Sequence, residues 1–369
     1  MVLHILSDDK FTDYAIKQFS SPEMKSEMIV IPSGAGHYFT KNNNVKVVSY
    51  PSSEFSFLLN NLVNYKAVVL HGIFWPFDKE IIEAIPKNVK LAWYFWGGEI
   101  YSHQKIMMSF LAPITKFLYK LYLYNKSFNI KNISVNRWRL PIELYKRIDY
   151  CLTSELEEYE YAKDYTKSNM DFLWYTCYSL EETIGDLINC RSKGENILFC
   201  NSAAVETNIF DAVLVLIRPS YSKHIRDKEI LVPLSYGEKW IKNLMLKIGP
   251  LCFKHFKPII DFLPRQEYNK MMLNCSTLIL PYYSPAGQGN IITALWLGMR
   301  VYISNRSIAL KYFRRIGIII YSFEDDFEKY GTIPLSDDIV YHNRNILMNV
   351  YSKKTVSQCC EKLIRTLEK

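Results

Sequence analysis

The sequence predicts an α/β protein built from two doubly wound parallel sheets. Short runs rich in Val, Ile and aromatic residues alternate with helical patterns along both halves of the chain, as in parallel sheets with helices on both faces. The 369 residues exceed the usual size of a single hydrophobic core, and 49% of them are hydrophobic. We therefore expect two domains of similar size, each with its own core.

The elements of the first half follow this alternation. Strands are predicted at residues 2–6, 28–31, 45–50, 67–71, 90–95 and 148–153. Helices are predicted at residues 12–19, 55–62, 78–85, 154–165 and 179–190. Ser154 is the expected N-cap of its helix, because glutamates follow it closely. The short polar stretch 191–195 marks the hinge, so the first domain is expected to span residues 1–190.

The second half repeats the pattern. Strands are predicted at residues 196–200, 229–234, 277–280, 300–303 and 316–321. Helices are predicted at residues 209–217, 238–247, 265–274, 290–297 and 355–367. We expect a second domain over residues 195–354, followed by a C-terminal helix at 355–369.

The stretch 277–303 is the best-defined strand–helix–strand unit of the second half. Asn290 is the expected N-cap of its helix, and Gly298 is expected to end that helix in the left-handed conformation. Two glycines precede the helix, which allows a ligand to approach the backbone and the free N–H groups of the helix start. The loop and helix start also supply polar groups that could bind a diphosphate: Tyr283, Ser284, Gln288, Gly289 and Asn290. The alternative is that the glycines only turn the chain.

Two further turns of the second half carry polar residues at predicted strand ends. Asn201 and Ser202 follow the strand at 196–200, and Tyr236 follows the strand at 229–234. The carboxyl ends of parallel strands are where α/β proteins bind their ligands. These three residues are therefore candidate contacts for the same phosphate or sugar ligand.

Carboxylates follow two predicted strands of the first half. Asp8 and Asp9 come after the first strand, and Glu99 comes after the strand at 90–95. A carboxylate at the ligand-binding edge of a sheet can act as a general base. The alternative for each residue is a solvated surface carboxylate.

The segment 103–147 carries all the excess positive charge. It has nine basic residues and one acidic residue, and its net charge of +8 equals that of the whole chain. Apolar residues at three- and four-residue spacing predict an amphipathic helix over 105–124, kinked at Pro113. One side of this helix is expected to hold Met107, Phe110, Leu111, Ile114, Leu118 and Leu121.

Basic amphipathic helices with aromatic residues are typical of proteins that bind anionic membrane surfaces. Two alternatives are a core-packed helix with a solvated basic face and a nucleic-acid site, but no recognised nucleic-acid motif accompanies the segment. The uncharged run 271–299 is interrupted by proline, glycine and polar residues, which argues against a membrane span there.

The remaining composition predicts neither a metal site nor a secreted protein. The eight cysteines form no C-x-x-C pair, so structural thiols in a reducing compartment are expected. The first residues have the pattern of a buried strand rather than that of a signal peptide. The histidines are scattered, and no metal ligand set can be assigned.

Several short blocks resemble one enzyme family in their order along the chain. The blocks are Trp96-Gly97-Gly98-Glu99, Asn201-Ser202, Val232-Pro233-Leu234 with Tyr236, and 268–305 with Gln288-Gly289 and Gly298-Met299-Arg300-Val301. The chain resembles the TDP-N-acetylfucosamine:lipid II N-acetylfucosaminyltransferases, which have two Rossmann-like domains facing across a cleft, the GT-B architecture. It departs from them at Ala203-Ala204, where the family has glycine, and after the first strand, where the family has histidine.

The resemblance implies an inverting, metal-independent transfer of an acetamido-dideoxyhexose from a dTDP or UDP donor. The acceptor would be an undecaprenyl-diphosphate-linked oligosaccharide of bacterial surface polysaccharide synthesis. The enzyme would then work at the cytoplasmic face of the bacterial inner membrane as a peripheral protein. Two alternatives remain from the residues themselves: a soluble nucleotide-sugar 2-epimerase of the same fold, and a noncatalytic protein that binds lipid or polysaccharide.

Overall fold

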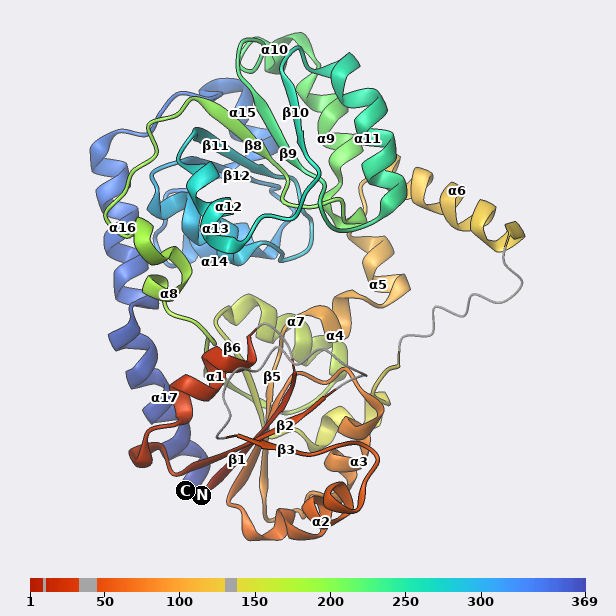
Figure 1. Cartoon of the computed structure of the whole chain (residues 1–369), viewed down its shortest axis with the longest axis vertical. Coiled ribbons are helices and arrows are strands. Elements are labelled where there is room, and N and C mark those ends of the chain that lie inside the picture. Colours follow the sequence, from red (N-terminus) through yellow and green to blue (C-terminus); the bar gives the residue numbers. More distant parts are fainter. Residues whose placement is uncertain (9–10, 33–44, 130–137) are drawn as a thin grey trace. The chain divides into compact units, whose positions relative to one another are not determined.

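The computed structural model describes residues 1–8, 11–32, 45–129 and 138–369, and the chain divides into two compact units (Figure 1). Unit 1 comprises Met1–Ser102, Val135–Ser179 and Ser352–Lys369. Unit 2 comprises His103–Ser134 and Leu180–Tyr351. Each unit is built around one parallel sheet, which confirms the predicted fold class.

The sheet of unit 1 has seven parallel strands in the order β3-β2-β1-β4-β5-β6-β7. Its strands are β1 (Val2–Ser7), β2 (Ser26–Ile31), β3 (Lys46–Val47), β4 (Ala67–His71), β5 (Lys90–Tyr94), β6 (Tyr150–Thr153) and β7 (Asp171–Trp174). The central strand β4 is buried along its whole length because helices cover both faces of the sheet. The strand order reverses at β1 and β4, where doubly wound sheets open a crevice at their carboxyl ends.

The helices of unit 1 connect these strands. They are α1 (Thr12–Phe19), α2 (Ser53–Asn61), α3 (Pro76–Ala84), α4 (Gly98–Tyr101), α7 (Leu156–Thr166) and α17 (Lys353–Glu368), with short 3₁₀ turns at Pro22–Met24, Leu62–Asn64 and Ile142–Arg147. The C-terminal helix α17 packs against α1, β1 and β7. Its buried residues join the same hydrophobic core as β1 and α1. Helix α17 therefore belongs to unit 1, although it is far in sequence from the other elements of that unit.

The sheet of unit 2 has six parallel strands in the order β10-β9-β8-β11-β12-β13. They are β8 (Asn196–Phe199), β9 (Ile230–Pro233), β10 (Phe256–Ile259), β11 (Cys275–Leu280), β12 (Arg300–Ile303) and β13 (Tyr321–Ser322). β11 lies between β8 and β12, and all six of its residues are buried. The strand that the sequence singled out is thus a central strand of this sheet.

The helices of unit 2 surround that sheet. They are α5 (Gln104–Ser109), α6 (Pro113–Asn129), α8 (Leu180–Ile184), α9 (Ile209–Leu216), α10 (Pro219–Ser222), α11 (Lys239–Cys252), α12 (Arg265–Met272), α13 (Gln288–Trp296), α14 (Ile308–Arg315), α15 (Phe323–Tyr330) and α16 (Asp337–Tyr351), with 3₁₀ turns at Gly185–Leu187 and Val205–Thr207. Helix α13 packs against α8 and α16. In the described part of the chain, no helix is both long and apolar enough to cross a membrane.

The basic segment and the boundary between the units differ from the sequence predictions. The helix predicted over 105–124 is divided into α5 and α6, because Pro113 starts a new helix rather than kinking one. The described part of the basic segment up to residue 129 belongs to unit 2, where α6 packs against α9. The boundary between the units falls at Ser179–Leu180, ahead of the polar stretch 191–195.

Candidate functional site

The turn between β11 and α13 forms one side of the carboxyl edge of the unit 2 sheet. Helix α13 begins at Gln288, and its N-cap is Gly287 in the left-handed conformation with φ 77°. The Ile291 N–H donates to the Gly287 carbonyl at 2.9 Å as the first turn of the helix. The predicted N-cap, Asn290, is therefore wrong: it is the third helical residue. Gly298 has φ 80° and follows the last turn, as predicted.

Gly287 brings this turn against the end of β8. A Cβ atom on Gly287 would lie 3.2 Å from the Asn201 side-chain nitrogen and 3.2 Å from Leu280. Its positive φ is also a conformation that a side chain disfavours. The first-turn N–H groups of Gly289 and Asn290 have no partner within an α-helix, which makes this turn suited to bind an anion.

The end of β8 is held by tyrosines from the neighbouring turns. Asn201 and Ser202 are both buried, and the Tyr282 hydroxyl donates to the Asn201 side-chain oxygen. Burial raises the pKa of Tyr236 and of Tyr282, and in each a hydrogen bond with Ser202 opposes that rise. The structure therefore brings Asn201, Ser202 and Tyr236 together, although they come from two different strand ends.

Gly237 allows the turns after β8 and β9 to lie backbone against backbone. The Ala203 N–H donates to the Tyr236 carbonyl at 2.9 Å, and the Glu238 N–H donates to the Ala203 carbonyl at 2.8 Å. A Cβ atom on Gly237 would lie 2.4 Å from the Ala203 carbonyl carbon, so no larger residue fits there. A hollow of about 270 Å³ opens beside this contact, and Lys239 and Lys242 are among its lining residues.

Lys239 and Lys242 were missed by sequence reasoning, and so was Arg306. The two lysines lie at the start of α11, and the Arg306 guanidinium lies 4.3 Å from the centre of the Tyr283 ring. A diphosphate bound at this edge would be stabilised by positive charge, whereas the candidates drawn from the loops were all uncharged. The lysines could have been found from their position directly after the Ser235-Tyr236-Gly237 turn.

The other predicted residues of the β11–α13 turn make internal contacts. The Ser307 hydroxyl donates to the Ser284 carbonyl at 3.3 Å, which links this turn to the end of β12. The Gln288 amide donates to the Tyr351 hydroxyl at 3.3 Å, and that hydroxyl lies 2.5 Å from the Tyr312 hydroxyl. The Gln288 side chain is thus engaged with α16.

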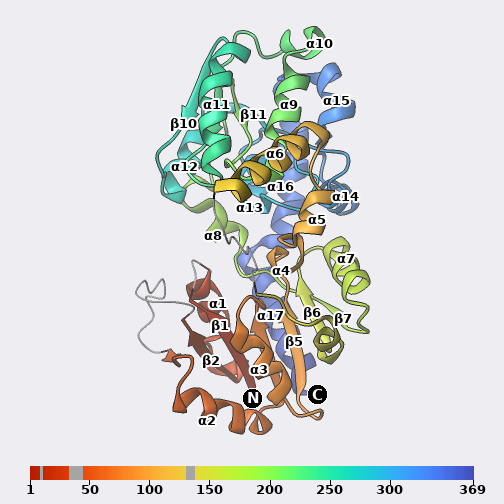
Figure 2. The same ribbon diagram turned by 90° about the vertical axis from the view of Figure 1, so that its right-hand side faces the viewer.

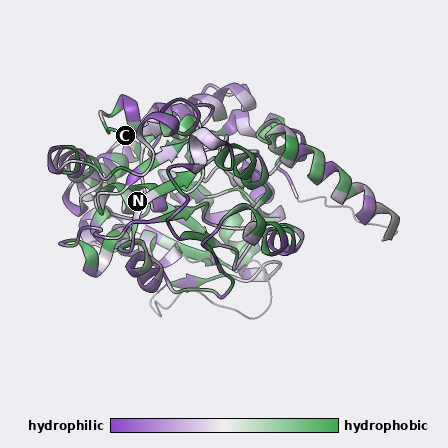
Figure 3. Ribbon diagram, turned by 90° about the horizontal axis from the view of Figure 1, so that it is seen from above, coloured by the Kyte–Doolittle hydropathy of each residue, from purple (hydrophilic) through white to green (hydrophobic). Residues whose placement is uncertain are grey.

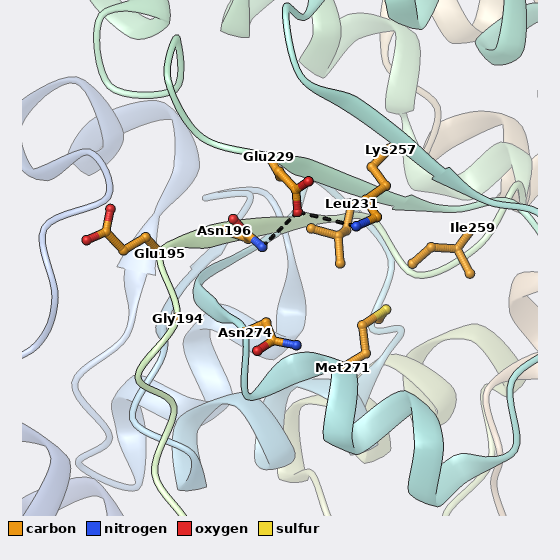
Figure 4. Close-up of a pocket in the computed structure, with 9 residues that line it drawn as sticks. All are labelled: Gly194, Glu195, Asn196, Glu229, Leu231, Lys257, Ile259, Met271 and Asn274. Carbon is orange, nitrogen blue, oxygen red and sulfur yellow. Dashed lines mark hydrogen bonds and ion pairs between the residues drawn. The ribbon is translucent and has the colours of Figure 1, made fainter.

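A larger hollow of about 370 Å³ lies at the other end of the same sheet (Figure 4). Its rim includes Glu229, which accepts a hydrogen bond from Asn196 at 3.1 Å and forms an ion pair with Lys257 at 3.5 Å. Asn196 and Glu229 stand at the amino ends of β8 and β9, opposite to the turns described above. Ligands of open parallel sheets bind at the carboxyl ends, so this hollow is not the candidate site.

The two predicted carboxylates of unit 1 that the structure describes, Asp8 and Glu99, are buried rather than solvated surface groups. Asp8 is 8% exposed and Glu99 is 7% exposed, while Asp9 lies outside the described residues. The Glu99 Oε1 accepts from the Trp93 indole N–H at 3.1 Å and from the Trp96 backbone N–H at 3.4 Å. Desolvation raises the pKa of Glu99 to about 7, more than these hydrogen bonds lower it.

Two histidines form a second buried polar group in unit 1. The His4 Nδ1 and the His71 Nε2 lie 3.0 Å apart on the neighbouring strands β1 and β4. The other ring nitrogen of each has no hydrogen-bond partner in the described part of the chain. Burial lowers the pKa of His71 to about 3, and burial together with the charge of His71 lowers the pKa of His4. Both rings are therefore neutral at pH 7.

The chain has the GT-B glycosyltransferase fold, since its two-sheet architecture matches solved structures of that fold over its whole length. It is similar to a glycosyltransferase from Rickettsia africae (TM-score 0.63, 12% identity, 100% of this chain and 98% of that one). It is also similar to Anabaena HepE solved with UDP-glucose (TM-score 0.60, 10% identity, 99% of this chain and 100% of that one). A third similar structure is sucrose-phosphate synthase from Thermosynechococcus elongatus (TM-score 0.57, 9% identity, 100% of this chain and 99% of that one). No protein-family model and no curated protein sequence matches the chain.

Proposed function

We propose that the protein is an inverting glycosyltransferase that takes a sugar from a pyrimidine nucleoside diphosphate. The observation that carries this proposal is the β11–α13 turn. There, a left-handed Gly287 sets the start of a helix against Asn201 at the carboxyl edge of a parallel sheet. A solved protein of the same fold, HepE, binds UDP-glucose, which supports a nucleotide-sugar donor. The two alternatives differ in their products: a nucleotide-sugar 2-epimerase would interconvert nucleotide sugars without an acceptor, and a noncatalytic binding protein would form no product.

In this proposal unit 2 stabilises the leaving nucleotide. The N–H groups of Gly289 and Asn290 and the partial positive charge of the helix start receive the diphosphate as its charge develops. Lys239 and Lys242 at the neighbouring hollow supply full positive charges. These groups provide the neutralisation for a transfer without a metal ion, as the family resemblance implies. Asn201, Ser202, Tyr236, Tyr283, Ser284 and Gln288 complete the proposed donor site.

The chemical step then needs a base on the acceptor side. The acceptor oxygen attacks the anomeric carbon from the face opposite the diphosphate, which inverts the configuration, and its proton passes to a carboxylate. Asp8, Asp9 and Glu99 remain the proposed candidates. Glu99 fits best, because a base with a pKa near 7 is partly ionised and still basic at neutral pH.

The acceptor in this proposal is an undecaprenyl-diphosphate-linked oligosaccharide at an anionic membrane surface. The sugar would be an acetamido-dideoxyhexose of the N-acetylfucosamine type. The membrane would be the bacterial inner membrane, contacted from its cytoplasmic side through the segment 103–147. Helix α6 provides the structural support for the membrane contact, because it carries two apolar faces.

The first apolar face of α6 is used inside unit 2. Leu118 and Tyr119 pack against the hydrophobic core, and the Tyr122 ring stacks on Trp240 with ring centres 5.2 Å apart. The Asp211 carboxylate accepts the N–H groups of Ile114 at 2.9 Å and Thr115 at 2.7 Å. Figure 2 shows α6 crossing the helices α9 and α11 of the same unit.

The second apolar face of α6 is exposed. It consists of residues at helical spacing, with exposed fractions of 40% for Ile114, 64% for Phe117, 46% for Leu121 and 60% for Tyr124. We call these four residues the outer stripe. The sequence predicts Ile114 and Leu121 on the buried side with Leu118; in the structure both are exposed, and Leu118 next to them is partly buried against the core.

The charge of α6 matches an anionic surface. The helix contains Lys116, Lys120 and Lys126 and no acidic residue. Figure 3 shows hydrophobic and hydrophilic positions alternating along this helix, at the right of the view. An apolar stripe with flanking lysines gains free energy both from burial of the stripe and from anionic headgroups. The outer stripe is therefore the proposed membrane contact of this protein.

The proposed function is tested by supplying candidate donors and acceptors to the purified protein. Binding of UDP, dTDP, GDP and ADP is first measured by calorimetry, with tight binding expected for the pyrimidine diphosphates. Transfer is then followed by mass spectrometry of undecaprenyl-diphosphate-linked glycans in anionic vesicles. Binding of none of these nucleotides would refute the donor site. Interconversion of the nucleotide sugar without an acceptor would favour the 2-epimerase.

A further inference from the structure

Four aromatic side chains gather at the carboxyl edge of the unit 1 sheet without being fully buried. They follow four different strands: Phe11 comes after β1, Phe74 after β4, Trp96 after β5 and Tyr178 after β7. Each of the four is partly exposed, whereas Trp93 inside β5 is fully buried. The strands β1, β4 and β5 are adjacent in the sheet (Figure 1). The cluster therefore lies where the strand order reverses, which is where doubly wound sheets bind their ligands.

Three of these rings stack on one another. The Phe11 ring lies on Trp96 with ring centres 4.7 Å apart and planes 25° apart, and it also stacks on Tyr178 with ring centres 6.1 Å apart. Trp96 in turn contacts Tyr94, whose ring centre is 4.5 Å away. Phe11, Trp96 and Tyr178 all pack against the same hydrophobic core. The core therefore fixes the geometry of the stack, while part of each ring stays exposed.

Gly72 makes room for the fourth ring at the end of β4. Gly72 has φ 101°, and a Cβ atom on it would lie 2.6 Å from the Phe74 ring and 3.2 Å from the Trp96 ring. A Cβ atom on Gly98 would lie 3.2 Å from the same Phe74 ring. The Phe74 backbone is also held in place, because its N–H donates to the Asp78 carboxylate at 2.8 Å. Two turns without side chains thus allow Phe74 and Trp96 to lie over the same strand end.

The charged groups beside this cluster are carboxylates. Phe11 follows Asp8 by three residues in the turn after β1, and the Trp96 N–H donates to the Glu99 carboxylate at 3.4 Å. Carboxylates repel a phosphate or an acidic ligand. A bare hydrocarbon chain would desolvate them further without pairing them. A neutral ligand that has both an apolar face and hydroxyl groups therefore fits these surroundings best.

We propose that this aromatic cluster binds a pyranose ring of the acceptor glycan. This inference rests on the proposed glycosyl transfer and names the part of unit 1 that recognises the acceptor. The C–H face of the sugar ring packs on the exposed parts of Phe11, Trp96 and Tyr178, and its hydroxyl groups remain beside the turn that carries Asp8. The contact needs a ring face, so a linear polyol with the same hydroxyl groups does not bind there.

The first test measures KM and kcat for the acceptor separately in Trp96→Leu. Loss of the indole ring is expected to raise the acceptor KM about tenfold, with kcat and the donor KM nearly unchanged. Trp96→Tyr keeps an aromatic ring and is expected to recover most of the affinity. Tyr150→Leu is the matched control, because Tyr150 packs against the same core but stands at the amino end of β6. Active transfer with equal acceptor KM in Trp96→Leu and Tyr150→Leu overturns the aromatic site and leaves the proposed function intact.

A second test needs no transfer. Saturation-transfer NMR detects contact of the purified protein with chitobiose, cellobiose, sorbitol and farnesyl phosphate, and a thermal melt checks that each variant is folded. The wild type is expected to saturate the ring protons of at least one disaccharide and none of the sorbitol protons. Trp96→Leu is expected to lose this signal, and Tyr150→Leu is expected to keep it.

Three results of the NMR test overturn the proposal: no contact with either disaccharide, a signal from farnesyl phosphate or sorbitol that equals or exceeds that of the disaccharides, or a disaccharide signal that Trp96→Leu leaves unchanged. If the signal depends on Trp96 but no sugar is transferred from any donor, the sugar site stands and the proposed function fails. If Trp96→Leu does not fold, Tyr178→Leu is measured in its place, and a signal equal to that of the wild type is the overturning result.

Discussion

Replacing the exposed apolar residues of α6 is expected to release the protein from anionic membranes. The outer stripe contains Phe117, which is 64% exposed, and Leu121, which is 46% exposed. Full burial of a Phe or Leu side chain stabilises by about 1.5–3 kcal/mol. Scaled by these exposed fractions, membrane insertion of Phe117 contributes about 1–2 kcal/mol and that of Leu121 about 1 kcal/mol. The double variant Phe117→Ser and Leu121→Ser should therefore bind membranes about 30-fold to 100-fold more weakly.

The assay is co-flotation with vesicles that contain phosphatidylglycerol, at low salt and at about 0.5 M salt. Phe57→Ser is the matched control, because Phe57 is 62% exposed on helix α2 of unit 1. The control should float as the wild type does. Lys116→Gln with Lys120→Gln should lower binding by about 1 kcal/mol for each lysine, an effect that high salt abolishes.

Two results would refute this reasoning. Equal flotation of the wild type and the double serine variant would show that the outer stripe does not enter the bilayer. Equal losses for Phe57→Ser and Phe117→Ser would show that exposed aromatic residues anywhere on the chain produce the same effect. Because both substitutions remove an exposed side chain, neither is expected to change the melting temperature by more than a few degrees.

Three further predictions concern the donor turn, the histidine pair and the attachment of α6. Gly287→Ala is expected to weaken UDP or dTDP binding about tenfold, measured by calorimetry. The control is Gly185→Ala, which should leave the affinity unchanged, because Gly185 also has a positive φ but no atom lies within 4 Å of its Cβ position. Equal effects of the two substitutions would contradict the role of the turn. The pKa of His71 is about 3 in the folded state against 6.5 in the unfolded state, so the unfolded state binds more protons below pH 6.5 and the free energy of unfolding falls as the pH decreases toward 3. His71→Asn should flatten this dependence by about 1.4 kcal/mol per pH unit, measured by urea titrations at several pH values. An unchanged slope would contradict the assignment. Asp211→Ala leaves the N–H groups of Ile114 and Thr115 in α6 uncapped and is expected to lower the free energy of unfolding by about 1–2 kcal/mol. Limited proteolysis should then cut α6 faster than in the wild type. Resistance to proteolysis equal to that of the wild type would show that the cap is dispensable.

The central strands and the donor turn could be predicted because their signals are local. β11 is an uninterrupted apolar run, and Gly298 stops α13 where a left-handed residue is required. The start of α13 was misplaced because Asn290 has the side chain of an N-cap, whereas the backbone turns at Gly287. Whether a glycine or an asparagine caps a helix depends on the space around the cap residue. Here the Asn201 side chain lies close to Gly287, and this proximity cannot be read from the sequence.

The elements that were missed depend on neighbours distant in sequence. β10 contains Lys257 and Pro258, which weaken a strand pattern, but it is an edge strand where proline is tolerated.

The two faces of α6 illustrate the limit of periodicity. Apolar residues at three- and four-residue spacing were taken as a single buried face, whereas Leu118 packs inward and Ile114 and Leu121 point outward. Hydrophobic spacing shows that a helix has apolar stripes, but tertiary contacts decide which stripe the core uses. In α6 the core contacts come from Leu118 and Tyr119, and Tyr122 stacks on Trp240.

One buried residue connects the attachment of α6 to the donor turn within unit 2. The Asn208 side-chain amide donates to the Phe110 carbonyl at 3.0 Å and to the Pro281 carbonyl at 3.4 Å, while its oxygen accepts the Ala112 N–H at 2.8 Å. Phe110 and Ala112 join α5 to α6, and Pro281 begins the loop after β11. Asn208 itself has φ 53°, a conformation that asparagine tolerates better than most residues. The proposed membrane helix and the proposed nucleotide loop therefore share one hydrogen-bonded centre, so an altered side chain at position 208 would disturb both.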